Sequence, residues 1–169
     1  MDHALHTHHA HRPQAAGSRS SLNRLAWSAT LHCLSGCAIG EVLGMVVGTA
    51  LGLGAGATIA LAVALAFVFG FALTMLPLLR HGLGFKQALR LAFASDTASI
   101  AIMELVDNSI MFAIPGAMTA GLASMLFWMS LAGALALAAL AAFPVNRWLI
   151  RRGAGHAVVH AFHGPQGSL

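Results

Sequence analysis

A glycine recurs at every fourth position across one apolar stretch of the chain, at Gly36, Gly40, Gly44, Gly48, Gly52 and Gly56. On a helix this spacing forms a stripe along which another helix backbone can approach closely. Cys33, Cys37 and Glu41 follow the same step, so their row runs beside the stripe. An ionised glutamate turned to lipid would cost at least about 2.5 kcal/mol. The pattern therefore predicts a tightly packed helix whose polar row faces protein.

The length of the apolar segments predicts the fold class. Four windows, at about 27–50, 57–79, 88–113 and 123–146, are long enough to cross about 30 Å of hydrocarbon. Because 58% of the residues are hydrophobic and only 8% are charged, we expect an all-α fold, an integral membrane bundle of four transmembrane helices.

The windows also suggest how the chain is divided. We expect a disordered His-rich tail over residues 1–26, one transmembrane domain over 27–150 and a second tail over 151–169. We expect no cleavable signal peptide, because the first apolar segment contains Glu41 and is too long for a signal-peptide core.

The basic residues predict the orientation in the membrane. They form three groups, at Arg12, Arg19 and Arg24, at Arg80, Lys86 and Arg90, and at Arg147, Arg151 and Arg152. The loops around 51–56 and 114–122 contain none. This positive-inside pattern predicts a multi-pass protein of the inner (plasma) membrane with both termini in the cytoplasm. It also accounts for the net charge of +4 without nucleic acid as a partner.

A second polar helix is predicted around Asp96, Glu104 and Asp107, three carboxylates within twelve residues of an apolar window. At 100° per residue, Asp96, Met103 and Asp107 share one helix face. Counting 1.5 Å per residue from the basic end places Cys37 near the depth of Asp96, and Glu41 near that of Glu104. With no Lys or Arg at comparable depth, bound protons or a bound cation must neutralise these carboxylates.

The donor types favour a metal. The predicted ligands are His32, Cys33, Cys37, Glu41, Asp96, Met103, Glu104 and Asp107. Thiol, imidazole, thioether and carboxylate donors together favour a transition-metal ion, Cu, Zn or Fe, over Mg or Ca. We therefore expect a membrane protein that binds or transports such a cation between its first and third helices. Histidines in the two tails offer further weak sites, at His3, His6, His8, His9, His11, His156, His160 and His163.

Other interpretations stay open at this stage. The glycines could serve packing alone, with the cysteines as small core residues. The carboxylates could relay protons and the cysteines could cycle between thiol and disulfide in a membrane enzyme subunit, although an enzyme is the less favoured class. The chain could also be a structural assembly module, its glycine stripe pairing with a second copy in a homo-oligomer.

Several stretches resemble one bacterial membrane-protein family. They are HCLSGCAIGEVLGM, FALTMLPLLR, SDTASIAIMELVDN and FPVNRW. These long motifs resemble the family catalogued as domain of unknown function 4396, over about Trp27 to His163. The resemblance implies a four-helix integral membrane protein and brings no established activity.

Overall fold

The computed structural model describes residues 14–152, and side chains from residue 19 onward. Its elements are α1 (Gln14–Ala50), α2 (Ala55–Arg80), α3 (Phe85–Ala113), the 3-10 helix η1 (Ala117–Thr119) and α4 (Met125–Arg151). Within this part of the chain there is no β-strand, and the predicted all-α class with four long helices is confirmed. The tail histidines named above lie outside the described residues.

The helix boundaries differ from the predicted windows mainly at the start. Helix α1 begins at Gln14, so residues 14–26, which the sequence assigned to a disordered tail, are helical. This segment contains Ala, Leu, Arg and Gln, all good helix formers. The links after α1 and α2 turn at Gly52 and Gly82, whose φ angles of 65° and 86° are strained for residues with a Cβ.

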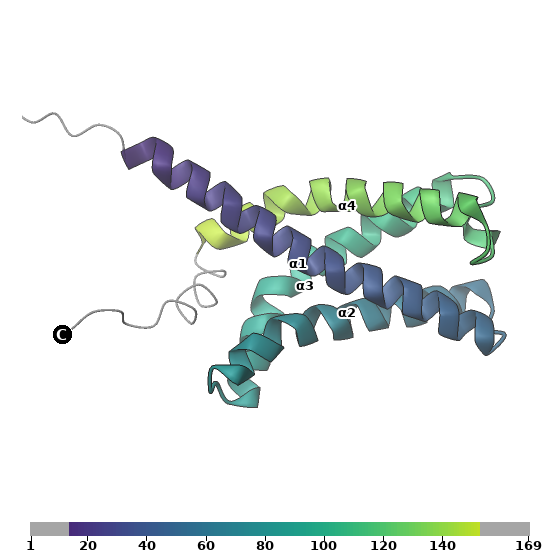
Figure 1. Cartoon of the computed structure of the whole chain (residues 1–169), viewed down its shortest axis with the longest axis horizontal. Coiled ribbons are helices and arrows are strands. Elements are labelled where there is room, and N and C mark those ends of the chain that lie inside the picture. Colours follow the sequence, from purple (N-terminus) through teal and green to yellow (C-terminus); the bar gives the residue numbers. More distant parts are fainter. Residues whose placement is uncertain (1–13, 153–169) are drawn as a thin grey trace, which may run out of the picture.

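The four helices form one bundle in which α1 packs most extensively against α2 and also contacts α4 (Figure 1). Helix α3 packs against α4 and α2 and makes a smaller contact with α1. The start of α1, the link between α2 and α3 and the end of α4 lie at one end of the bundle, hereafter the basic end (Figure 1). The links 51–54 and 114–124 lie at the other end, hereafter the neutral end.

The glycine stripe of α1 faces α2, whereas the sequence left open which helix approaches it and allowed pairing with a second copy. A Cβ added at Gly36 would lie 2.6 Å from the Cα atom of Gly70 in α2. A Cβ at Gly40 would overlap the backbone of Ala66, and one at Gly44 would overlap Ala62. Because α2 already covers the stripe along these turns, it is not a free surface for homo-oligomer formation.

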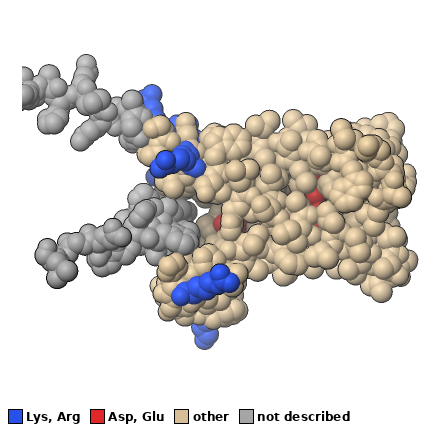
Figure 2. Space-filling view, in the orientation of Figure 1, with Lys and Arg blue, Asp and Glu red and all other residues tan. Residues whose placement is uncertain are grey.

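Three helices are long and apolar enough to cross a membrane: α1 from Arg19, α2 and α4. They indicate a membrane protein. Helix α3 has 29 residues but contains both basic and acidic side chains. Figure 2 shows the described Lys and Arg side chains gathered at the basic end, with acidic atoms visible within the otherwise uncharged body.

Candidate cation site between helices α1 and α3

The polar rows of α1 and α3 are buried inside the bundle. Glu41, Glu104 and Asp107 are 6%, 5% and 4% exposed, and Asp96 is 7% exposed. Met103 shares the buried face of α3 with these acids, as the four-residue and three-residue spacing predicts. The structure thus turns the acidic face of α3 away from the surrounding medium.

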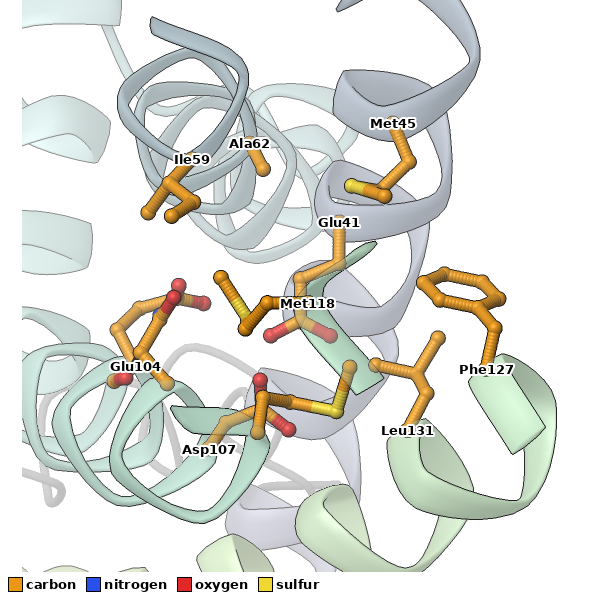
Figure 3. A pocket seen from close by; sticks show the side chains of 11 residues that line it. Glu41, Met45, Ile59, Ala62, Glu104, Asp107, Met118, Phe127 and Leu131 are labelled. Carbon is orange, nitrogen blue, oxygen red and sulfur yellow. Dashed lines mark hydrogen bonds between the residues drawn. The ribbon is translucent and has the colours of Figure 1, made fainter. Parts of the chain in front are cut away.

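Three of these carboxylates meet in one cavity. Figure 3 shows Glu41 from α1 and Glu104 and Asp107 from α3 projecting into a shared space. The cavity has a volume of about 40 Å³, enough for a small ion or a few water molecules. We call it the carboxylate pocket; its lining residues are Glu41, Met45, Ile59, Ala62, Glu104, Asp107, Asn108, Met111, Met118, Phe127 and Leu131.

The carboxylate oxygens in this pocket accept no hydrogen bond of good geometry, although Glu41 lies against the carboxyl group of Asp107 and Glu104 lies against the Cys37 thiol. Among the residues described, neither oxygen of Glu41 or Glu104 accepts a hydrogen bond, and the same holds for Oδ1 of Asp107. The neighbouring Asn108 amide donates instead to the backbone oxygen of Glu104, at 2.9 Å. The sequence has no Lys or Arg between positions 25 and 79 or between 91 and 146. A buried cluster of this kind is neutral only when it holds protons or a cation.

The two cysteines connect this pocket to Asp96. Cys37 lies beside Glu104 and Glu41, and one turn earlier Cys33 lies beside Asp96. Both thiols are free and almost completely buried. The depth count from the sequence predicted that Glu41 lies beside Glu104, as the structure shows. It also predicted that Cys37 lies beside Asp96, but the neighbour of Asp96 is Cys33.

A second polar group lies closer to the basic end. His32 Nε2 and Thr74 Oγ1 share a hydrogen bond of 3.0 Å, which joins α1 to α2. Ser95 donates a 2.7 Å hydrogen bond to Oδ1 of Asp96, and Asp96 faces both Thr74 and His32. We call these four residues the His32 group.

The predicted ligands therefore do not form one metal site but are divided between the carboxylate pocket, the His32 group and the cysteines that lie between them. Met103 packs in an apolar cluster with Cys33 and Cys37. Within residues 14–152, no three His, Cys, Asp or Glu side chains form an arrangement ready to hold a metal ion. An ion in the carboxylate pocket would need side-chain rotation or donors of another kind.

Sequence reasoning missed three pocket residues, Met45, Met111 and Met118. A signal was present for two of them, because Met45 follows Glu41 by four positions and Met111 follows Asp107 by four, which is about one helical turn. Met118 lies in η1, outside any helical repeat, and only the folded chain brings it to the pocket.

The comparisons with known proteins identify a family for the chain. The chain matches no curated protein and no solved structure. The model of one family, described as a domain of unknown function, matches residues 23–155, which include all of α2, α3 and α4 and both polar groups. The chain belongs to this family, DUF4396.

Proposed function

We propose first that α3 is a fourth membrane span and that the basic end faces the cytoplasm. With 29 residues, α3 is about 43 Å long, sufficient to cross the hydrocarbon core. Beyond its basic first turns, its exposed surface includes large apolar side chains, among them Leu105 at 69% and Phe112 at 72% exposure. The neutral loops and the clustered basic residues support cytoplasmic termini by the positive-inside rule.

Within this bundle, we propose that the carboxylate pocket binds a transition-metal cation, Cu, Zn or Fe, in exchange for protons. One observation carries this proposal: three buried carboxylates point into one cavity, and the oxygens of Glu41 and Glu104 accept no hydrogen bond of good geometry from the described residues. A cation would neutralise the cluster, and protons would do so in its absence. Exchange keeps the buried charge small in both states.

The position of the cysteines supports movement of the cation. A row of polar groups runs from Asp96 past Cys33 and Cys37 to Glu104, with neighbouring members in electrostatic contact. It follows the interface of α1 and α3 from near the basic end toward the neutral end. Donors at successive depths suit transport better than a single structural metal centre would.

The test is cation binding by the full-length protein with its eight tail histidines replaced by glutamine. Removing these imidazoles prevents binding in the tails from masking the pocket. We expect near-stoichiometric retention of Zn, Cu or Fe after purification, measured by elemental analysis. The triple variant Glu41→Gln, Glu104→Gln, Asp107→Asn should lose most of it.

A matched control is Ser130→Ala, because Ser130 is a buried polar residue of α4 that does not line the pocket. This variant should retain the metal. If the parent and the triple variant carry equal amounts of metal, the proposal is wrong. If neither binds metal but proton flux into proteoliposomes depends on Glu41, the proton-relay alternative replaces it.

A further inference from the structure

The carboxylate pocket has a second class of donor that the proposed function does not use. Three methionines line it, each from a different element: Met45 from α1, Met111 from α3 and Met118 from η1. Figure 3 shows the Met45 and Met118 side chains in the same space as Glu41 and Glu104. The sulfur atoms and the unpartnered oxygens are thus parts of one pocket.

Thioether sulfur discriminates between ions. It is a soft, uncharged donor that suits Cu(I), whereas carboxylate and water oxygens suit Mg, Ca and Mn. A thiolate or imidazole ligand must first lose a proton, but a thioether carries no proton to lose. Methionine is also flexible, so its sulfur can move toward an ion without displacement of a helix.

The carboxylates supply an independent indication of a ligand. Glu41 and Glu104 are at least nine-tenths buried, point into the pocket, and have no hydrogen-bond partner among residues 14–152. A methionine pocket that served packing alone would require no such groups. Conversely, oxygen donors alone do not form a ready arrangement in the described chain.

We propose, on the basis of the cation exchange argued above, that the pocket selects a soft monovalent cation of the Cu(I) and Ag(I) class. Thioethers of Met45, Met111 and Met118 are its sulfur ligands. One carboxylate of the cluster balances its single positive charge, and protons neutralise the other two. Because Met118 belongs to η1 and the link 114–124, the pocket lies toward the neutral end.

Ag(I) is the probe, because it does not change oxidation state under the conditions of the measurement. The protein is the full-length chain with the tail histidines replaced by glutamine and with Cys33→Ser and Cys37→Ser, so that neither imidazoles nor thiols compete. The test variant carries Met45→Leu, Met111→Leu and Met118→Leu. The control carries Met75→Leu and Met129→Leu, two methionines that do not line the pocket.

We expect the test variant to bind Ag(I) at least tenfold more weakly than the parent and to bind Zn(II) with unchanged affinity. The control should bind both ions as the parent does. Ag(I) affinity within twofold of the parent in the test variant would overturn the inference. The variant lacking the three carboxylates separates this inference from the proposed function. If that variant loses both ions while the methionine variant binds Ag(I) as the parent does, the cation-exchange site is supported and only its proposed selectivity is wrong.

A second measurement does not require the triple variant to fold. X-ray absorption at the silver edge, on the parent protein with one equivalent of Ag(I), reports the atoms bound to the ion. Sulfur neighbours are expected in this cysteine-free background, and their number should fall in the single variant Met118→Leu. A first shell of oxygen or nitrogen alone would contradict the inference.

Discussion

Gly40 of α1 lies directly against the backbone of Ala66 in α2, so these two helices approach as closely as backbones allow. This contact fixes the rotation of α1 about its own axis. Cys37 and Glu41, the immediate neighbours of the stripe, are consequently buried beside Glu104 of α3. The glycine repeat thus orients the polar row.

The first prediction concerns this contact. Replacing Gly40 with Leu places a side chain where the backbone of Ala66 now lies, and the helices must separate. We expect a loss of about 3 kcal/mol or more in the free energy of unfolding, because rigid backbone cannot yield as side chains do. Thermal unfolding in detergent measures it. Gly133→Leu is the control, since no atom lies within 4 Å of a Cβ at Gly133; equal stability of both variants would contradict the packing.

The second prediction concerns the interface of α1 with α4. Asn146 donates a buried 2.9 Å hydrogen bond to Oγ1 of Thr30, which in turn donates to the backbone oxygen of Ala26. A double-mutant cycle with Asn146→Ala and Thr30→Val should give a favourable coupling of about 0.6 to 1.7 kcal/mol, the range for hydrogen bonds between membrane helices. Strict additivity of the two substitutions would show that this bond contributes nothing.

The third prediction concerns topology. Reporter fusions at Gly54 and Ala120, both at the neutral end, should give signals from the outer side of the membrane. A fusion after Arg152, at the basic end, should give a cytoplasmic signal. A cytoplasmic signal at Gly54 or Ala120 would rule out a fourth span by α3 or reverse the proposed orientation.

Sequence periodicity predicts which residues of a helix are buried, but it does not predict which helix packs against them. The spacing of Asp96, Met103 and Asp107, seven and then four residues, correctly placed them on the buried face of α3. The partner of the glycine stripe was not predictable in the same way. Glycines at this spacing permit a close approach by any helix, and only the small Gly70, Ala66 and Ala62 of α2 complete the contact.

The methionines of the pocket show a different limit. Methionine in an apolar helix is ordinarily core filling, so the four-residue step from Glu41 to Met45 and from Asp107 to Met111 is only a weak signal in the sequence. Met118 reaches the pocket through the fold of the link 114–124, which carries no repeating pattern. Selection of ligands among equivalent residues therefore requires three-dimensional information.

The fourth prediction concerns access to the two polar groups. Ser95 and Asn108 are half-buried neighbours of Asp96 and Asp107, about 13 residues apart on α3, or about 20 Å. In a background with Cys33→Ser and Cys37→Ser, Ser95→Cys should react with a membrane-impermeant thiol reagent from the cytoplasmic side. Asn108→Cys should react from the outer side. Equal protection of both positions from both sides would indicate a sealed structural network.

The central claim is that cations and protons compete for Glu41, Glu104 and Asp107. The most direct measurement is the number of protons released as a cation binds, followed with a pH indicator in weakly buffered detergent solution. The protein carries the substituted tail histidines together with Cys33→Ser and Cys37→Ser, because a thiol that bound Ag(I) would also release a proton. The account predicts about one proton released for each Ag(I) bound, and tighter binding as pH rises, because a lower proton concentration competes less. Cation binding without proton release, or equal release from the variant lacking all three carboxylates, would contradict it.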